Sequence, residues 1–388
     1  MSVHPNVAKI VTLITNEITT LENKKLRWAS FKKENVAILK HLLGLDHTDV
    51  EKPGNLIGFD IDESRNLILM NYTGTAHNVL HEVPGGWTDV LKSMRGLVYE
   101  FGGAGLRWAR DYTPKLVGRG FEKFFNYNEV EESNCSLLEN KYGTGKFVCR
   151  EKADGHMIEY FVHRGELCST TRGKFGTASA GIASNMLGLS DFRQVEKTLS
   201  KNILSIVVEL VHPTTEVFVD YDNAEMLYLL AAYDSDGQKL SLSEVNHICE
   251  VMPDTFTAPN SREMSLDEII SEVNNREVAN HEGWVADFNG QLVKFKYISY
   301  IGKMVESKLS YKYLMNCIKN NRLDHMLITL PEEVRATAYN MVGNLNQIAE
   351  MAVSCGDHKL LYQLHSPMEA GESYFRTVCR NYFKHLTS

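Results

Sequence analysis

Residues 147–155 read Phe-Val-Cys-Arg-Glu-Lys-Ala-Asp-Gly, a stretch whose side chains alternate with period two as far as Lys152 and then enter a turn. This pattern predicts a strand that ends in a turn. Gly155 lets the backbone turn tightly and lets a ligand approach it closely. Lys152 therefore ends a strand, where a lysine can act as a covalent nucleophile once its ammonium group has lost a proton.

A nucleophilic Lys152 needs surroundings that lower its pKa. An unperturbed lysine, with a pKa of ~10.4, is only about 0.1% neutral near pH ~7.4. Lowering the pKa by ~3 units requires roughly 4 kcal/mol of differential stabilisation, which nearby cations and desolvation usually supply. Without such neighbours, a Lys-x-Asp-Gly sequence is better explained as an ordinary turn. Asp154 is expected to be structural in either case, closing that turn.

A second segment supplies candidate cations. Residues 282–288 and 291–296 are two apolar-rich runs joined by Asn289-Gly290, which is a strong signal for a β-hairpin. Lys294 and Lys296 are two residues apart, so they share one face of the returning strand. Two ammonium groups on one face are costly against an apolar core, but they are tolerated against solvent or a polyphosphate.

The position of Glu282 does not follow simply from this hairpin. With a two-residue turn, Val285 pairs with Lys294 and Gly283 pairs with Lys296, which leaves Glu282 on the opposite face. For Glu282 to share a site with the two lysines, it must lie at the strand entrance, or a bulge must turn it inward.

Three further segments carry charges that suit a phosphorylated ligand. Arg95 begins a predicted strand, and its planar guanidinium favours bidentate phosphate contact. Residues 122–126 combine Lys123 with two aromatic residues and an amide. Glu209 interrupts the apolar run 203–211, where an unpaired carboxylate would be costly. A core ion pair and a contact to a ribose hydroxyl both explain that carboxylate.

The order and spacing of these segments resemble those of covalent nucleotidyltransferases, and most closely those of the bacteriophage RNA ligase 1 family. The resemblance extends from about Asn66 to Tyr300, and the joint order is far more specific than any single motif. It implies an α+β fold with a nucleotidyltransferase domain of ATP-grasp-like antiparallel sheets. In chain order, the matching segments are Arg95-Gly, Lys123-Phe-Phe-Asn, Lys152-x-Asp-Gly, Glu209, Glu282-Gly and Lys294-x-Lys296.

The resemblance implies an ATP-dependent RNA ligase that joins 5′-phosphate and 3′-hydroxyl RNA ends. In that family a lysine attacks the α-phosphate of ATP, releases pyrophosphate and becomes lysyl-AMP. The AMP then passes to an RNA 5′-phosphate, and a 3′-hydroxyl displaces it. The implied cofactors are ATP as co-substrate and Mg²⁺ (or Mn²⁺). The implied partner is RNA, with tRNA and a separate polynucleotide kinase/phosphatase as candidates in RNA or tRNA repair.

Carried over by position, the resemblance also implies roles for individual residues. Lys152 is the expected nucleophile, and Lys294 and Lys296 are expected to bind the α-phosphate and to depress the pKa of Lys152. Glu282 is expected to act through metal-bound water. The expected nucleotide or substrate contacts are Arg95, Lys123, Phe125, Gly155, Arg172, Glu209 and Tyr300.

The chain departs from the family pattern in several places. Arg172 stands where the family often has a lysine, so the charge is kept with a different geometry. An aromatic residue is common at the position of Val208, and its replacement leaves Phe125 as the candidate for stacking on adenine. Met157 occupies a position where DNA ligases and mRNA-capping enzymes typically carry an arginine, which favours the RNA ligase branch. Fungal tRNA ligases fuse further domains, for which we expect no room in 388 residues.

Composition sets wider bounds. A content of 43% hydrophobic and 23% charged residues describes an ordinary soluble protein. The net charge of −8 argues against non-specific nucleic-acid binding, so RNA contacts are expected to use local basic patches, such as those in residues 24–40 and 303–322. The seven cysteines contain no Cys-x-x-Cys pair, so neither zinc nor a redox dithiol is indicated. With no signal peptide and no long apolar run, we expect a cytoplasmic protein without a membrane partner, in the host cytoplasm if it is phage-encoded.

Three domains are expected. Residues 1–55 carry helical periodicity and form an N-terminal extension. In residues 56–300, the adenylyltransferase domain, short strands dominate without a regular strand–helix alternation, which favours antiparallel sheets. Residues 301–388 are expected to form a helical C-terminal domain, which the resemblance makes a candidate RNA-specificity module. The expected helices are near 177–202 and 241–250 in the middle domain, and at 303–321, 332–353 and 372–386 in the last.

Two classes of function remain open on this reading. The first is the RNA ligase. The alternative is a nucleotide-binding or RNA-end-binding protein of the same fold that does not seal ends, with a DNA ligase or a capping-type nucleotidyltransferase as a further alternative. The full set of cations and carboxylates favours the ligase, because a binding protein has no need for an exposed lysine nucleophile.

Overall fold

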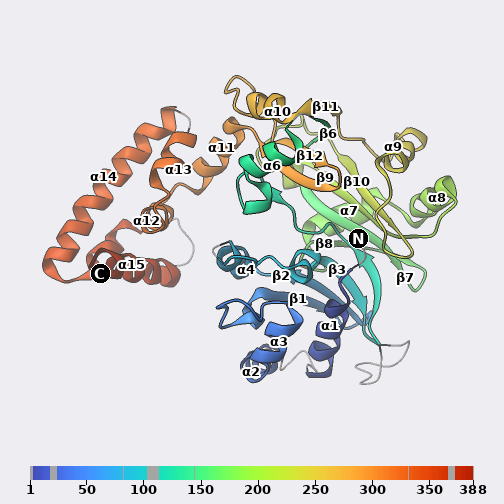
Figure 1. Cartoon of the computed structure of the whole chain (residues 1–388), viewed down its shortest axis with the longest axis horizontal. Coiled ribbons are helices and arrows are strands. Elements are labelled where there is room, and N and C mark those ends of the chain that lie inside the picture. The colour runs from blue at the N-terminus through green and yellow to red at the C-terminus, as the bar shows by residue number, and fades with distance from the viewer. Residues whose placement is uncertain are drawn as a thin grey trace. The chain divides into compact units, whose positions relative to one another are not determined.

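The structure is a computed structural model of the 388-residue chain (Figure 1). It describes residues 3–17, 24–81, 83–102, 113–143, 145–330, 332–365 and 372–387. The chain divides into two compact units. The first unit consists of Met1–Leu266 and Trp284–Lys294, and the second of Asp267–Gly283 and Phe295–Ser388.

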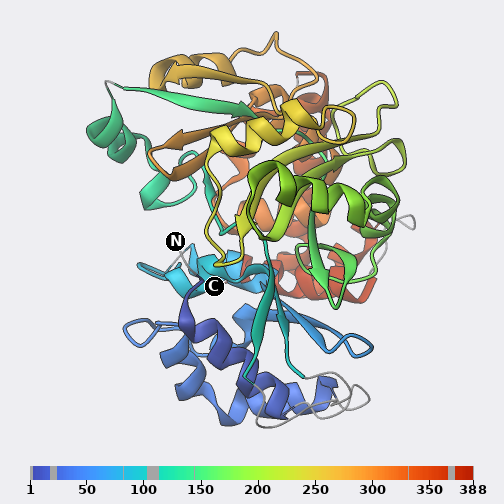
Figure 2. The same cartoon turned by 90° about the vertical axis from the view of Figure 1, so that its right-hand side faces the viewer.

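The N-terminal helices of the first unit pack on a small antiparallel sheet. The helices α1 (Pro5–Glu17), α2 (Lys24–Glu34) and α3 (Val36–Leu42) lie beside its strands in both views (Figure 1, Figure 2). Their apolar side chains, among them Ile10 and Leu39, share one hydrophobic core with side chains of the sheet. The expected N-terminal extension is therefore part of the core that supports this sheet. The sheet runs in the order β1 (Ile57–Asp62), β2 (Leu67–Tyr72), β3 (Arg95–Glu100) and β4 (Lys115–Arg119).

Two central sheets have most of their residues in the first unit. In the four-stranded sheet all neighbouring strands are antiparallel. In the five-stranded sheet β6 pairs antiparallel with β11 and with β12, and β13 pairs parallel with β5. The four-stranded sheet has the order β10 (Met226–Asp234), β9 (Ile203–Val211), β7 (His156–His163) and β8 (Glu166–Thr171). The five-stranded sheet has the order β11 (Ser261–Ser265), β6 (Lys146–Glu151), β12 (Gly283–Phe288), β13 (Gln291–Lys296) and β5 (Phe125–Asn126).

The expected hairpin and its two-residue turn are present. β12 and β13 are neighbours, and Asn289 and Gly290 both have positive φ angles, of 54° and 97°. Positive φ at both central positions is the geometry of the type I′ turn, which matches the natural twist of the flanking strands. The strand predicted at the start of the Lys152 motif is β6, and Lys152 follows its last residue. The α+β class with antiparallel sheets is thereby confirmed.

Three helices cover one face of the four-stranded sheet. Phe192 and Ile248 from these helices join Ile158 and Ile206 from the strands in one buried core. The last of the three helices begins with a capping box, in which Ser241 and Glu244 each bind the other's backbone N–H. The helices are α7 (Ala178–Met186), α8 (Leu189–Leu199) and α9 (Leu242–Val251), close to the expected helical stretches. The remaining helices of this unit are α4 (Gly74–Leu80), α5 (Asp89–Ser93) and α6 (Cys135–Tyr142), with short 3-10 turns at Pro53–Leu56, Glu131–Ser133 and Pro213–Thr215.

The second unit is largely helical and has its own core. Leu314, Leu345 and Phe375 are among the residues that pack together inside it. The expected single helix at 303–321 is wrong, because the chain breaks at Leu309 and restarts with Ser310 as the N-cap, whose hydroxyl accepts from Tyr313 N. The helices of this unit are α10 (Leu266–Val273), α11 (Ile298–Lys308), α12 (Tyr311–Lys319), α13 (Leu323–Thr329), α14 (Glu332–Cys355) and α15 (Glu372–Thr387), with a 3-10 segment at His358–Leu364. Among the described helices of the chain, none is both long and apolar enough to cross a membrane.

The first residue of β12 is a glycine whose backbone lies too close to another strand for a side chain to fit. Gly283 has a φ of +152°, and a Cβ atom built on it would lie 1.9 Å from the carbonyl oxygen of Phe295. We expect Gly283→Ala to lower the free energy of unfolding by roughly 3 kcal/mol or more, since backbone must move to relieve the clash. Urea-induced unfolding followed by circular dichroism measures this change.

Gly290 in the same hairpin is the matched control. Its φ of +97° is unfavourable for alanine, but a Cβ atom there would meet no heavy atom within 4 Å. We expect Gly290→Ala to cost about 1–2 kcal/mol, the strain of the backbone conformation alone. Equal losses in the two variants would contradict the close approach at Gly283.

Candidate active site

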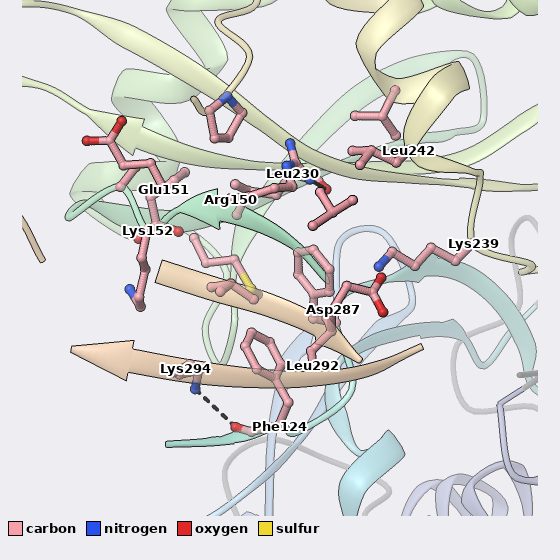
Figure 3. Close-up of a pocket in the computed structure, with 18 of the residues that line it drawn as sticks. Phe124, Arg150, Glu151, Lys152, Leu230, Lys239, Leu242, Asp287, Leu292 and Lys294 are labelled. Carbon is pink, nitrogen blue, oxygen red and sulfur yellow. Dashed lines mark hydrogen bonds between the residues drawn. The ribbon is translucent and has the colours of Figure 1, made fainter. Parts of the chain in front are cut away.

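A cavity of about 520 Å³ lies within the first unit, lined by residues of both central sheets (Figure 3). Its volume is within the usual range for pockets that bind small molecules. One end carries the cations Lys152 and Lys294, and the middle is lined by apolar side chains such as Leu230 and Leu292. Arg95 also lines the cavity, and its charge acts on Lys294. A cationic end joined to an apolar middle suits a ligand with a phosphate group and an aromatic base.

Lys152 is presented to this cavity by the end of β6. Its half-buried side chain extends toward the strand that carries Lys294 (Figure 3). The preceding residue, Glu151, pairs with Trp284 of β12 and accepts a hydrogen bond of 2.6 Å from the amide of Asn260. The β-ladder and this side-chain contact hold the end of the strand in place, and they thereby fix the backbone position of Lys152.

Asp154 binds the backbone of a segment that is distant in the sequence, which is a structural role. Its Oδ2 accepts hydrogen bonds from the backbone N–H groups of Phe218 and Val219, at 2.9 and 3.0 Å. Its own N–H donates to the hydroxyl of Tyr221 at 2.8 Å. The aspartate therefore anchors residues 218–221 beside the turn in which it lies.

Gly155, in the turn that follows Lys152, contacts Glu209. The N–H of Gly155 donates to Glu209 Oε1 at 3.3 Å, and a Cβ atom on Gly155 would lie 2.1 Å from the carbonyl oxygen of Leu210. Only glycine allows this approach of the turn to β9. Glu209 is half-buried, lines the cavity and raises the pKa of Arg95, so it lies near both a cation and a ligand-sized space.

Lys294 lies at the centre of the cation cluster. Its Nζ donates to the carbonyl oxygen of Phe124 at 3.1 Å and lies 4.3 Å from the centroid of the Phe124 ring. Burial holds the pKa of Lys294 well below its usual range, and Arg95, Lys123 and Lys152 lower it further. Because electrostatic repulsion acts on both partners, the ammonium groups of Lys152 and Lys294 destabilise each other.

Arg95 and Arg172 are linked through Tyr72. Burial lowers the pKa of Arg95, and Arg172 lowers it further, whereas Tyr72 and Glu209 raise it. Arg95 Nη1 donates to the carbonyl oxygen of Phe121 at 3.3 Å, which orients it at the cavity wall. The exposed Arg172 donates to the Tyr72 hydroxyl at 3.3 Å. Both predicted arginine contacts thus belong to one group of side chains.

Lys123 and Phe125 lie in a buried cluster beside the cavity. Lys123 is 8% exposed, binds Glu129 Oε1 at 3.4 Å and lies 4.4 Å from the Phe125 ring centroid. Phe125 is 2% exposed and packs edge-on against Trp87, whereas its neighbour Phe124 lines the cavity. The role of Phe125 in stacking on adenine stays a prediction. Sequence reasoning had not identified Glu129, which organises this cluster.

Glu282, Lys296 and Tyr300 come together in the second unit. Lys296 Nζ and Glu282 Oε1 form an ion pair of 2.8 Å, and Lys296 lies 4.9 Å from the ring centroid of Tyr300. Glu282 precedes the first residue of β12 and is 3% exposed, so it lies at the strand entrance, which is the first of the two arrangements expected for it. The N–H of Tyr297 also donates to its carbonyl oxygen, at 3.0 Å.

The far end of the cavity carries charges that sequence reasoning had missed. Lys239 and Asp287 lie there, and Arg150 lines the cavity beside Leu230 (Figure 3). Burial lowers the pKa of Lys239, while Asp287 raises it and Arg150 lowers it. Arg150 donates to the carbonyl oxygens of Leu229 and Leu230, both at 2.9 Å. Arg150 lies two residues before Lys152, and side chains two apart in a strand share one face. The sequence could therefore have predicted that Arg150 faces the cavity.

The state of Lys294 gives a test of the cation cluster. We expect Lys152→Met to raise the pKa of Lys294, because one of the charges that repel its ammonium group is removed. NMR of lysine side-chain ¹³Cε resonances, followed from about pH 6 to about pH 11, measures this pKa. Lys197→Met, at an exposed position on α8, is the matched control. An unchanged titration of Lys294 in Lys152→Met would show that the two amines do not interact.

The same shift has a consequence for stability. The pKa of Lys294 in the folded state lies below the value of ~10.4 that it keeps in the unfolded chain. Between these two values the unfolded state binds more protons, so the free energy of unfolding rises with pH across that window. We expect this rise to be smaller in Lys294→Met, as measured by urea unfolding at a series of pH values.

Comparison with known proteins identifies a family for this chain. A family model for RNA ligases of the T4 RNA ligase 1 type matches residues 93–312, which is more than half of the 388-residue chain. A protein of Thermovibrio ammonificans, named as a candidate RNA ligase, is 25% identical over 284 residues, covering 70% of this chain and 68% of the relative.

Two solved structures are also similar in part. An archaeal ATP-dependent RNA ligase aligns with 86% of this chain and 84% of its own, at 13% identity and a TM-score of 0.48. A variant of the Naegleria gruberi RNA ligase, with ATP and Mn, aligns with 44% of this chain at 15% identity and a TM-score of 0.36. The match spans 54% of the Naegleria chain. Through the family match, the chain belongs to the T4 RNA ligase 1 family of RNA ligases.

Proposed function

We propose that this protein is an ATP-dependent RNA ligase, which joins RNA 5′-phosphate and 3′-hydroxyl ends through lysyl-AMP and RNA-adenylate intermediates. The observation that carries the proposal is the cationic end of the cavity, where Lys152 and Lys294 act on each other electrostatically beside Arg95. A structural turn has no need of such a cluster, because each added cation destabilises the fold. A bound phosphate offsets this destabilisation, because its negative charge attracts each of the cations.

In the first step Lys152 reacts as a neutral amine. Its nitrogen lone pair forms a bond to the α-phosphorus of ATP while the bond from that phosphorus to the pyrophosphate oxygen breaks. The nitrogen then gives up one proton, which leaves a phosphoramidate and free pyrophosphate. Lys294 and Arg95, which line the same cavity, support this step, because they lower the energy of charge that develops on the phosphate oxygens.

The next two steps transfer and then release the AMP. An oxygen of the RNA 5′-phosphate attacks the adenylate phosphorus, the phosphorus–nitrogen bond breaks, and Lys152 recovers a proton. The 3′-hydroxyl oxygen then attacks the 5′-phosphate phosphorus and loses its proton, and AMP leaves. The family match supports RNA as the substrate class. We further propose tRNA as one such RNA and a separate polynucleotide kinase/phosphatase as the partner that prepares its ends.

The side chains of the cavity also fit a divalent cation. Glu151, Glu209 and Asp287 supply carboxylate oxygens along its wall, and Mg²⁺ or Mn²⁺ binds through one or two carboxylates plus phosphate oxygens. When bound, such an ion neutralises charge on the polyphosphate. Glu282 is proposed to organise metal-bound water, and its ion pair of 2.8 Å with Lys296 supports a carboxylate that is held in one orientation.

Covalent labelling tests the nucleophile. We expect wild-type protein incubated with α-labelled ATP and Mg²⁺ to retain the label through denaturing electrophoresis, and Lys152→Ala to retain none, because it lacks the reacting nitrogen. Lys294→Met should label roughly 100-fold more slowly, as expected for loss of one group that stabilises the transition state. Lys197→Met on α8 is the control and should label like wild type. Label on Lys152→Ala would assign the nucleophile to another residue, and an unlabelled wild type would favour a binding protein that does not seal.

The choice of polynucleotide gives a separate test. We expect RNA ends with a 5′-phosphate and a 3′-hydroxyl to be sealed at least roughly tenfold faster than DNA ends of the same sequence, a difference of about 1.4 kcal/mol in activation free energy. Single-turnover sealing with pre-adenylated protein measures both rates without the labelling step. Equal rates on nicked duplex DNA would identify a DNA ligase instead.

A further inference from the structure

A cluster of metal-binding side chains lies outside the cavity, at the end of α4. His77 and His81 are four residues apart and therefore face the same side of the helix end. Glu129, from the segment after β5, is brought against them. One ligand atom from each of the three lies within 4.8 Å of the other two. We propose that His77, His81 and Glu129 form a binding site for a single divalent transition-metal ion of the zinc class.

The distances fit such an ion. Bonds of about 2.0–2.2 Å arranged tetrahedrally around zinc separate neighbouring ligand atoms by about 3.3–3.5 Å. Glu129 Oε1 lies 2.9 Å from His81 Nε2 and 3.9 Å from His77 Nδ1, so the two distances bracket the tetrahedral value. The second distance is too long for a hydrogen bond, but shifts of about half an ångström would satisfy both metal bonds.

The contacts of His81 fix the orientation of its ring. Its Nδ1 lies against the backbone carbonyl oxygen of His77, and the indole nitrogen of Trp87 lies 3.4 Å from the same Nδ1. Its Nε2 faces the carboxylate of Glu129, 2.9 Å away. A backbone partner at one ring nitrogen commonly orients metal-binding histidines and leaves the other nitrogen for the ion.

Glu129 is held in the orientation that a ligand needs. Its Oε2 accepts hydrogen bonds from the backbone N–H and the side-chain amide of Asn126, both at 2.6 Å, which leaves Oε1 directed at the histidines.

The ligand set selects the class of metal. Two imidazole nitrogens and one carboxylate suit Zn²⁺ and the neighbouring ions Co²⁺ and Ni²⁺, whereas Mg²⁺ and Ca²⁺ prefer oxygen ligands. His77 is the more exposed histidine, with 48% of its side chain accessible, so solvent can reach a fourth coordination position. The site does not depend on the proposed ligase activity.

Lys123 gives the site a distinctive property. Its ammonium nitrogen lies 3.4 Å from the same Glu129 Oε1 that the metal would use. The ammonium group therefore competes for that oxygen and repels the ion. Since Lys123 and Glu129 both act on the pKa of Lys294, occupation of the site would also change the electrostatics of the cavity.

Cobalt binding tests the proposal on the full-length, tag-free chain after dialysis against a chelator. We expect one equivalent of Co²⁺ to give the intense visible absorption of a tetrahedral complex, and Zn²⁺ to displace it. His77→Ala and His81→Ala should each weaken Co²⁺ binding roughly tenfold or more, whereas Lys123→Met should strengthen it, since a competing charge is removed. The matched control is His41→Ala, which removes an exposed histidine hydrogen-bonded to Asp46 at 2.9 Å.

The outcomes separate the proposal from a purely structural cluster. A hydrogen-bonded trio without metal affinity would show no tetrahedral spectrum in wild type, and that result overturns the proposal. Equal Co²⁺ affinity in wild type and in the His77→Ala, His81→Ala double variant overturns it as well, because the ion would then bind elsewhere. Circular dichroism confirms that each variant is folded. The Lys123→Met variant keeps all three ligands, and we expect its affinity for Co²⁺ to rise. Partial unfolding would lower that affinity, so it could not produce the same result.

Discussion

Repulsion between the cations at one end of the cavity is the constraint on which the site depends. Lys152, Lys294 and Arg95 approach a common space, and the pKa of Lys294 is lowered by burial and by the other two. Without a ligand such an arrangement destabilises the fold, so other contacts must hold it. The cation cluster attracts phosphate oxygens, and it favours the neutral form of a lysine amine.

The surrounding structure holds these charges in place by close backbone contact. Gly155 approaches β9 so closely that a side chain would collide with the carbonyl oxygen of Leu210. Asp154 ties the same turn to the backbone of Phe218 and Val219. In the second unit Gly283 makes a similar approach to Phe295, next to the ion pair of Glu282 with Lys296. These close backbone contacts, at Gly155 and at Gly283, hold the cations in position against their mutual repulsion.

Charged residues beside the cavity, above all Glu129, are harder to identify from the sequence than the residues of the family motifs. Glu129 is a counter-charge for Lys123, is held by two hydrogen bonds from Asn126 and faces a pair of histidines. The absence of paired cysteines predicted no zinc site of the cysteine type. The histidine pair at i and i+4 was visible in the sequence, but its third partner is 48 residues further along the chain. Only the packing of α4 against the segment after β5 brings them together.

Local pattern was sufficient for much of this protein. Period-two alternation predicted β6, and Asn289-Gly290 predicted the hairpin, because both depend on interactions between residues close in the chain. The order of charged motifs likewise predicted the family that the match confirms. The break at Ser310, the burial of Phe125 and the gathering of Lys239, Arg150 and Asp287 along the cavity depended on tertiary packing. Contacts between distant segments decide burial and charge environment, and no local periodicity encodes them.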